Sequence, residues 1–432
     1  MIDTVEVFLW GRRIGIIHQN GTNGVPEFEY DPGFRGSGIE LAPFKMPLSD
    51  RVFSFPELRE SSAFRGLPGL VADTLPDRFG NSVINVWLRQ NGREAESMDP
   101  LERLCYTGTR GMGALEFFPA EGPDAADSNV DVTGLTELAS RILSEKERIV
   151  YDAEDLTVAQ MLKIGSSAGG ARAKAVIAWN ERSGEVRSGQ ARLPTDFDHW
   201  LIKFDNVRGN GDHGESDRRQ YTLIEYAYHL MAKDCGIEMS ECRILKKDGM
   251  SHFMTKRFDR RGGEKIFVQT LGALGHFDFN VPRTCGYETY AEMAKRLGIG
   301  RNGIGGIYRR AVFNVLSANC DDHVKNISFT MDRQGDWGLS PAYDLTFAYN
   351  PDNYWLREHQ MTIGGKSSNI SEDDLLAFGK RIGLNVRFCR DTLTAVRRVI
   401  RDWKRYADQC GIDAGTAAAI DAVLNGKITR SV

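Results

Sequence analysis

A group of polar residues in the second half of the chain has the types and spacing that phosphoryl transfer requires. Four residues separate Asp321 from Asn326, and Asp344 follows about 18 residues later, after a strand-like stretch. In a protein-kinase catalytic loop, an Asp with this spacing orients the attacking hydroxyl, while the Asn and a later acid bind magnesium beside the phosphates. Each residue alone could be a turn or helix-cap residue, but their order favours phosphoryl transfer.

The neighbouring acid, Asp322, is a second candidate for the catalytic base. Only Asp321 has the four-residue gap to Asn326, so we predict that Asp321 takes this role. The same carboxylates, with His323, could instead be ligands of a metal-dependent nuclease or phosphatase. That alternative leaves two upstream features unexplained, a glycine-rich loop and a lysine in an apolar strand.

The glycine-rich loop covers residues 165–174, reads GSSAGGARAK and precedes a strand-like stretch. Its small residues would let backbone N–H groups approach phosphate oxygens, and Arg172 or Lys174 could add positive charge. The segment matches neither the dinucleotide-binding pattern nor the Walker pattern, so a surface loop is the alternative.

Lys203 interrupts an apolar strand at residues 201–204, as the phosphate-binding lysine of a kinase does. Glu225, on the helix that follows, is its candidate charge partner. A lysine on an exposed strand face is the alternative. The segment 255–261 then closes the β-rich half of the chain, where a kinase hinge would hold adenine.

Strands that come first and helices that come later must position these residues. Strands are predicted at residues 4–19 with a break at Gly11, 26–30, 114–118, 175–179, 199–204, 244–257 with a turn at 247–249, 327–329 and 336–339. Helices are predicted at residues 58–90 with interruptions, 135–147, 221–235, 287–297, 307–318, 373–382 and 391–407. The last helix has a basic face opposite an apolar stripe, which we interpret as solvated surface. The order predicts an α+β fold, two-lobed and protein-kinase-like, with a β-rich N-terminal lobe and a helical C-terminal lobe.

Residues 119–132, rich in Pro, Gly, Asp and Ala, form the best candidate linker, with a loop inside one domain as the alternative. We therefore predict three regions. Residues 1–125 would form an N-terminal β-rich subdomain, and residues 126–260 a kinase N-lobe with the glycine-rich loop and the lysine strand. Residues 261–432 would form a helical C-lobe with the catalytic loop.

Composition restricts the classes of function further. The 432 residues are 41% hydrophobic and 26% charged, ordinary globular values that exclude wholesale disorder. The formal net charge of −4 argues against a free-standing nucleic-acid binder. No apolar run reaches the roughly 18 residues of a bilayer span, and the seven cysteines include no CxxC pair. We therefore expect a soluble cytoplasmic protein with reduced thiols and no membrane partner.

The sequence resembles the HipA family of serine/threonine-protein kinases, the toxins of HipBA toxin–antitoxin systems, over nearly its whole length. The matching segments are residues 72–80, 108–115, 166–174, 202–203, 256–261, 321–326 and 341–344. In two places the chain departs from known patterns. The hinge carries Lys256 where the best-known member has a glutamate, and the catalytic loop carries Asp322 where small residues are common. Compared with ordinary protein kinases, the chain also has no Arg before Asp321 and no Phe-Gly after Asp344. Classical activation-loop regulation is therefore not expected.

The resemblance implies ATP and Mg²⁺ as cofactors and assigns the site residues. Asp321 is implied to be the catalytic base, with Asn326 and Asp344 as magnesium ligands. The implied ATP contacts are Gly169, Gly170, Ala171, Arg172, Ala173, Lys174, Lys203, Lys256, Arg257, Phe258, His323, Lys325, Asn326, Tyr343 and Asp344. Ser167, with Ser166 as the alternative, is the implied autophosphorylation site, where a phosphoserine would compete with ATP phosphates for the loop.

The resemblance also implies partners. Family members phosphorylate an aminoacyl-tRNA synthetase, here glutamyl-tRNA synthetase by resemblance, and so stop translation, which is linked to persistence. A small helix-turn-helix antitoxin of the HipB type would hold the toxin and bind operator DNA, with the toxin as transcription corepressor. The alternative function is a catalytically silent corepressor that only docks this antitoxin. The presence of Asp321, Asn326, Asp344 and Lys203 together argues against that alternative.

Overall fold

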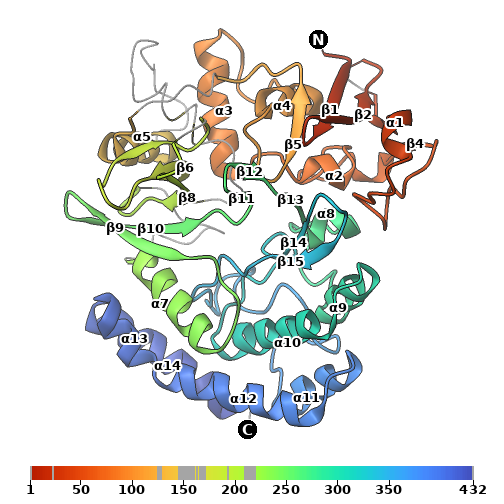
Figure 1. The fold of residues 1–432 in the computed structure, drawn as a ribbon. Coiled ribbons are helices and arrows are strands. Elements are labelled where there is room, and N and C mark those ends of the chain that lie inside the picture. The colour runs from red at the N-terminus through yellow and green to blue at the C-terminus, as the bar shows by residue number, and fades with distance from the viewer. Residues whose placement is uncertain are drawn as a thin grey trace.

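The computed structural model describes residues 2–21, 24–123, 129–144, 161, 164, 172–191, 194–208 and 220–430, with side chains of the last helix described to residue 426. Figure 1 shows sheets in its upper half and a layered helical region in its lower half. Strands therefore gather in the N-terminal part and helices in the C-terminal part, as the order along the sequence predicts.

The first sheet is formed by N-terminal strands, three of which alternate buried side chains with partly or fully exposed ones. Its order is β4-β3-β2-β1-β5, and all neighbours are antiparallel. The strands are β1 (Thr4–Leu9), β2 (Arg12–His18), β3 (Glu27–Tyr30), β4 (Val52–Ser54) and β5 (Leu115–Phe118). Between them lie α1 (Pro32–Arg35), η1 (Pro56–Leu58), α2 (Gly69–Ala72), α3 (Arg78–Gln90) and α4 (Pro100–Thr107).

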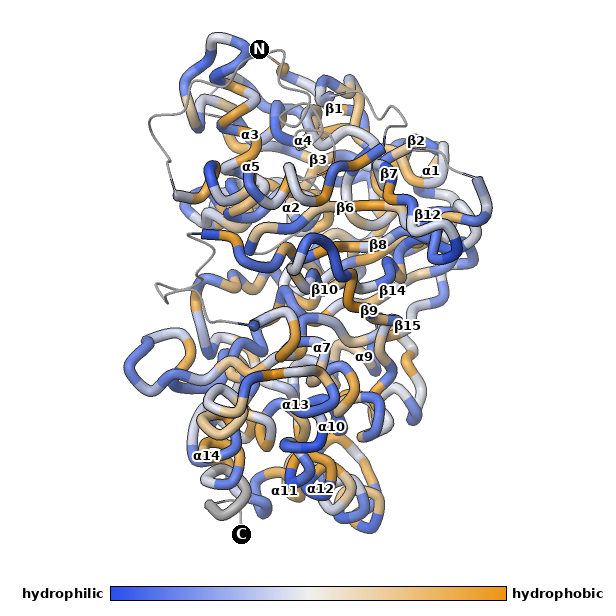
Figure 2. The backbone as a smooth tube through the Cα atoms, turned by 90° about the vertical axis from the view of Figure 1, so that its left-hand side faces the viewer, coloured by the Kyte–Doolittle hydropathy of each residue, from blue (hydrophilic) through white to orange (hydrophobic). Residues whose placement is uncertain are grey.

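The second sheet contains the lysine strand and is also antiparallel, with the order β7-β6-β8-β10-β9. Its strands are β6 (Lys174–Trp179), β7 (Val186–Ser188), β8 (Asp198–Lys203), β9 (Cys242–Lys247) and β10 (Met250–Lys256). Helices α5 (Val132–Ser144) and α7 (Tyr221–Asp234) pack against this sheet. In Figure 2, hydrophobic colour follows β6 and β8 through the interior, which agrees with the nearly complete burial of β6.

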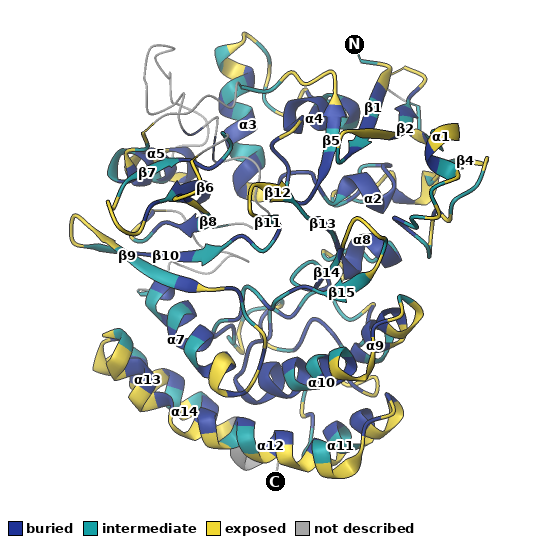
Figure 3. Cartoon of the chain, in the orientation of Figure 1, coloured by how far each residue is buried: buried dark blue, intermediate teal, exposed yellow. Residues whose placement is uncertain are grey.

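The remaining elements form a small sheet and a stack of helices. Strands β13 (Phe267–Thr270), β14 (Ser328–Met331) and β15 (Trp337–Leu339) form a three-stranded sheet, preceded by the pair β11 (Arg260–Arg261) and β12 (Glu264–Lys265). The helices are α8 (Leu271–Gly275), α9 (Tyr287–Arg296), α10 (Arg301–Leu316), α11 (Glu372–Arg381), α12 (Val386–Arg401), α13 (Trp403–Cys410) and α14 (Ala414–Arg430). Figure 3 shows α10 largely buried and α11 to α14 as an outer layer with an exposed face.

The C-terminal helices correct one sequence expectation. The single helix predicted over residues 391–407 is two helices, α12 and α13, which meet at Asp402. The apolar spacing continues across the break, because Ile400 and Trp403 are both buried, so periodicity alone does not reveal it. The basic face is solvated as expected, since Arg398 and Arg401 are exposed.

The apolar cores join segments that lie far apart in the sequence. One core combines the first sheet with Phe267 and Met331, and another combines Phe79 and Val83 of α3 with the second sheet. Within the described part of the chain, no helix is both long enough and apolar enough to cross a membrane.

Candidate active site

The lysine of the second sheet lies at a buried ion-pair centre. Lys203, at the end of β8, is buried, and its Nζ lies 2.7 Å from Oε1 of Glu225 on α7. The same Nζ also forms an ion pair with the carboxylate of Asp344. The predicted partnership of Lys203 and Glu225 is thus present, and one ammonium joins the strand, the helix and the later acid.

Burial and charge act in opposite directions on the three groups of this centre. Burial raises the pKa of Glu225, and the Lys203 charge only partly offsets it. Burial would also raise the pKa of Asp344, but Lys203 and Lys174 hold it below its ordinary value. Burial works against a charged Lys203, yet the two carboxylates raise its pKa. Asp344 and Lys203 are therefore both charged at neutral pH.

A second lysine lies beside the first. Lys174, on β6, is directly opposite Lys203 in the antiparallel register, and both are buried. Burial, and then repulsion from Lys203, lowers the pKa of Lys174. Two buried lysines on adjacent strands, both near Asp344, therefore gather cationic side chains at this end of the sheet.

The proposed catalytic loop is held by its own backbone. The Asn326 amide nitrogen donates to the Asp321 carbonyl at 3.1 Å, and the Asn326 backbone N–H donates to the His323 carbonyl at 2.9 Å. His323 Nε2 lies 3.9 Å from Asp321 Oδ1. The loop closes on itself, so Asp321 and Asn326 are brought together as their spacing predicts.

The two neighbouring acids have different environments. The Asp321 side chain is 22% exposed, whereas that of Asp322 is 0% exposed. Asp322 accepts hydrogen bonds from the Tyr287 hydroxyl at 2.8 Å and the Gln360 backbone N–H at 2.8 Å. Because Asp322 is enclosed, only Asp321 of this pair is accessible to a substrate hydroxyl.

The segment that carries Asp344 lies against the catalytic loop. The Tyr343 hydroxyl donates to the Lys325 carbonyl at 2.9 Å and lies 2.5 Å from Ser328 Oγ. Asp344 has a φ of 57°, an uncommon conformation for a residue other than glycine, and its side chain is 32% exposed. The residues just before Asn326 and just before Asp344 are therefore joined by a hydrogen bond.

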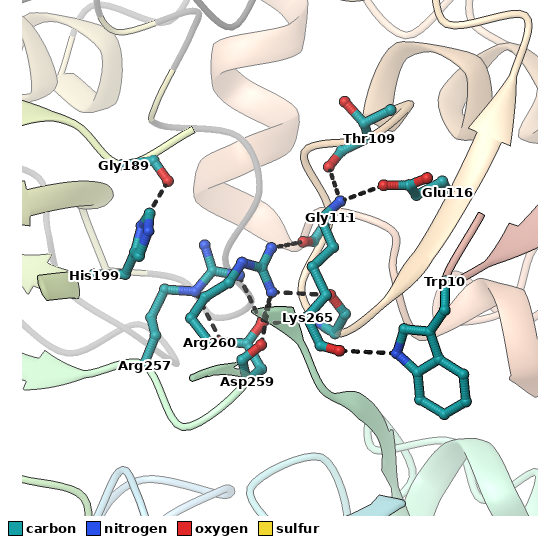
Figure 4. A network of polar contacts seen from close by, with 11 residues as sticks. Trp10, Thr109, Gly111, Glu116, Gly189, His199, Arg257, Asp259, Arg260 and Lys265 are labelled. Atoms are coloured by element: carbon teal, nitrogen blue, oxygen red, sulfur yellow. Dashed lines mark hydrogen bonds and ion pairs between the residues drawn. The ribbon is translucent and has the colours of Figure 1, made fainter. Parts of the chain in front are cut away.

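The three predicted hinge residues point in different directions. Phe258 stacks on Tyr343 with a centroid separation of 5.8 Å. Lys256 Nζ lies 2.7 Å from Asp198 Oδ2 at the start of β8. The Arg257 guanidinium is buried against Asp259 through bonds of 2.8 and 2.6 Å (Figure 4). Of the three, Phe258 lies next to the segment that carries Asp344, whereas Lys256 and Arg257 are paired with Asp198 and Asp259.

Part of the predicted phosphate loop lies outside the described residues, namely Gly169, Gly170, Ala171 and both serine candidates, Ser166 and Ser167. Of its described end, Arg172 lies over the Tyr221 ring at 4.2 Å. Ala173 is buried, and its carbonyl accepts from the Phe204 backbone at 3.2 Å.

Sequence reasoning missed a contribution from the N-terminal region. Asp77, the residue just before α3, forms an ion pair with Lys325 of the catalytic loop. Asp73 accepts from both the backbone N–H and the hydroxyl of Thr270 at 2.7 Å. Both acids lie in segment 72–80, which the family resemblance includes without a role, so the signal was a motif and not a spacing.

The residues present fit Mg²⁺ bound together with a nucleotide. The Asn326 amide nitrogen is occupied by Asp321, which leaves its oxygen as the atom for a cation, and the Asp344 carboxylate is partly accessible. Over the described ranges, no group of three or more His, Cys, Asp or Glu residues could hold a metal by itself. Magnesium is commonly bound by one or two side chains plus phosphates and water, which matches this small donor set.

Comparison with known proteins shows likeness over most of the chain. A family model described as the HipA-like C-terminal domain matches residues 166–415, and one described as the HipA N-terminal domain matches residues 5–118. A solved structure described as the Shewanella oneidensis MR-1 toxin–antitoxin system HipA, HipB and its operator DNA complex is 18% identical. It covers 99% of this chain and 96% of its own, with a TM-score of 0.68.

Another solved structure, described as the Helicobacter pylori proinflammatory kinase CtkA, is 11% identical with a TM-score of 0.37. It covers 54% of this chain and 87% of its own. No curated protein matches the sequence.

Proposed function

The chain belongs to the HipA family, and from this membership we propose that it is an ATP- and Mg²⁺-dependent serine/threonine-protein kinase that acts as the toxin of a toxin–antitoxin module. One observation carries the kinase proposal. Lys203 contacts Glu225 and Asp344 at once, and the Asp344 segment is bonded to the loop that holds Asp321 and Asn326. A lysine paired with a helix glutamate beside a metal-binding acid is the arrangement that kinases require.

Each residue takes a defined part in the proposed reaction. Lys203 and Lys174 hold the phosphate groups of ATP, and Phe258 packs at the hinge. Asp321 orients the substrate hydroxyl and receives its proton as the oxygen attacks the γ-phosphorus, while the bond from the γ-phosphorus to the β–γ bridging oxygen breaks and ADP leaves. Magnesium, held by Asn326 and Asp344, would neutralise phosphate charge when bound. Because Lys203 pairs with Asp344 here, we expect the nucleotide to take over part of that pairing.

The remaining parts of the proposal rest on the family. The substrate would be an aminoacyl-tRNA synthetase, glutamyl-tRNA synthetase first among them, so that phosphorylation in the cytoplasm stops translation. Ser167, or Ser166, would be the autophosphorylation site. A HipB-like antitoxin would bind the protein and carry it to operator DNA, since the Shewanella HipA was solved in a complex with HipB and its operator DNA. We retain residues 1–125, 126–260 and 261–432 as the proposed division of the chain.

Transfer of radiolabelled γ-phosphate from ATP tests the proposal. Wild type, Asp321→Asn and a control, Asp336→Asn at an exposed acid between β14 and β15, are incubated with Mg²⁺, alone and with glutamyl-tRNA synthetase and its tRNA. We expect label on the synthetase from wild type and the control, and none from Asp321→Asn. An active Asp321→Asn protein would overturn the assignment of the base.

The same assay distinguishes the kinase from the alternative function, a catalytically silent corepressor. Label only on the protein itself, mapped to Ser166 or Ser167, would support the kinase but exclude this synthetase as substrate. No label anywhere, from protein shown to be unphosphorylated beforehand, would favour the silent corepressor. A gel-shift assay with operator DNA and antitoxin, with and without the protein, would then measure corepression directly.

A further inference from the structure

Asp322, the acid excluded as the base, is the centre of a buried hydrogen-bond network. We propose that the pair of Asp322 and His359 is a positioning device, which holds the catalytic loop against the segment 354–363 and so fixes the location of Asp321. This role rests on the proposed kinase function. Neither residue is expected to contact the nucleotide or the substrate.

Both oxygens of the Asp322 carboxylate are engaged from outside the loop. Oδ2 accepts from the Tyr287 hydroxyl at 2.8 Å and lies 3.1 Å from His359 Nδ1. Oδ1 accepts from the Gln360 backbone N–H at 2.8 Å and, more weakly, from the Met361 N–H at 3.5 Å. The loop is thus bonded to helix α9 and to a segment about 40 residues later in the sequence through one side chain.

The pair is ionic. His359 is buried, and burial opposes its charge, but Cys320 and Asp322 raise the pKa of His359 to about 10. Cys320 Sγ lies 4.0 Å from His359 Nε2, on the opposite side of the ring from Asp322. A charged imidazole enclosed between two residues of the loop is poorly tolerated unless both partners stay in place.

The network fixes the residues on either side of the proposed base. The Cys320 backbone N–H donates to the Ala348 carbonyl at 2.9 Å, and Asp322 is held through both of its carboxylate oxygens. Only Asp321, between them, has a partly exposed side chain in this tripeptide. A shift of either neighbour would move the Asp321 carboxylate, and misplacement by about 1 Å can cost about 100-fold in rate.

The far side of the network continues into an exposed surface. The Arg283 backbone donates to the Gln360 carbonyl at 2.7 Å, and its guanidinium lies over the Tyr354 ring at 5.4 Å. Tyr354 is half exposed and is one of few large hydrophobic side chains exposed in the described chain. Asp322 is therefore connected, through the Gln360 backbone and Arg283, to an exposed surface.

The competing explanation is that the network only stabilises the fold. The two roles differ in what a substitution changes, because a stabilising role alters the folded fraction and a positioning role alters kcat of the folded molecule. ATP affinity per folded molecule should change little in either case, since two of its proposed contacts, Lys203 and Asp344, lie outside the network.

The test measures γ-phosphate transfer, ATP affinity and thermal unfolding for wild type, Asp322→Asn, His359→Gln and the double variant. Asp352→Asn, an exposed acid close to the segment, is the matched control. We expect each single variant to lose about 100-fold in kcat, with ATP affinity and KM for ATP within about twofold. The double variant should lose about as much as one single variant, because the neutral pair restores charge balance.

Several outcomes would overturn the role. These are single variants with wild-type kcat per folded molecule, losses that follow the unfolded fraction alone, or a double loss equal to the product of the single losses. If Asp322→Asn does not fold, Tyr287→Phe removes the hydroxyl that donates to Asp322 and accepts from Asn314, without burying a lone charge. It should lower kcat several-fold, and an unchanged kcat would overturn the proposal. A folded wild type that binds ATP but transfers no phosphate would instead overturn the proposed function itself.

Discussion

Two aspartates of this molecule, Asp344 and Asp259, are each paired with cationic side chains, but they differ in how far these partners enclose them. Asp344 forms an ion pair with Lys203, and its side chain remains 32% exposed. Asp259 receives both arms of Arg257 at 2.8 and 2.6 Å and an Arg260 nitrogen at 2.8 Å, and its side chain is 1% exposed.

The difference lies in what the partners leave open. The planar guanidinium groups of Arg257 and Arg260 surround the Asp259 carboxylate (Figure 4). The Gly113 backbone N–H donates to it as well at 2.8 Å, which connects the hinge to the N-terminal region. An ammonium is a point charge that leaves lone pairs of Asp344 accessible to a cation. Charge alone therefore does not distinguish a reactive carboxylate from a structural one, whereas saturation and exposure do.

Replacing Lys203 by Met should produce the largest effect and act on the reactive aspartate. We expect phosphoryl transfer to fall by about 10³-fold, because the phosphate-binding charge is lost. Lys203→Met should destabilise the fold less than Asp259→Asn, the next substitution considered. Asp344 is partly solvated, and the raised pKa of Glu225 lets the Glu225 carboxylate become neutral. Radiolabel transfer and urea unfolding measure the two effects.

The matched control for that change is Lys246→Met, at an exposed lysine of β9 in the same sheet. It should retain activity and stability. Near-normal transfer by the Lys203 variant would mean that the two aspartates do not divide into a reactive and a structural one.

Replacing Asp259 by Asn should act on the structural aspartate and mainly affect folding. It leaves the buried Arg257 and Arg260 without their counter-charge, which costs about 3–5 kcal/mol of unfolding free energy. Transfer per folded molecule should stay within about twofold, as tested by activity titrated against the folded fraction. A stable but inactive variant would contradict this division, with Asp408→Asn on the exposed face of α13 as control.

Acid should reveal the structural aspartate through the pH dependence of stability. Burial alone would raise the pKa of Asp259, but the charges of Arg257 and Arg260 hold this pKa below its ordinary value. A depressed carboxyl pKa stabilises the fold above the unfolded pKa, near 3.9, and this stability is lost as the pH falls through the folded pKa. Between about pH 5 and 2, wild type should lose about 2 kcal/mol more than Asp259→Asn. Parallel unfolding curves for the two proteins would refute the assignment.

Replacing Glu116 by Gln should give the smallest effect, because this acid lies at the edge of the same network. Its Oε1 is 2.8 Å from Lys265 Nζ, and both side chains are about a quarter exposed. We expect a loss below about 1 kcal/mol that shrinks further at high salt. Lys265 retains the Thr109 carbonyl at 2.6 Å. A loss of stability as large as that of Asp259→Asn would mean that Glu116 is as important to the network as the buried Asp259.

What the sequence could predict follows from the range of the interactions. The family resemblance and the α+β fold are confirmed. Asp321 and Asn326, which are close in sequence, are also joined by a hydrogen bond in the structure. The pairs Asp322–His359 and Asp77–Lys325 join residues 37 and 248 positions apart, and no local pattern encodes them. Helix α14 was missed because small residues such as those at 417–419 give it little apolar contrast.

The shared cores have a consequence for how this chain can change over generations. Phe267, in the matched C-terminal segment, packs into the core of the first sheet, and Phe79, in the matched N-terminal segment, packs into the core of the second. A recombination event that exchanged one segment for a relative's copy would set unmatched side chains against both cores. The two segments should therefore be inherited together, and a substitution in one should be followed by compensation in the other.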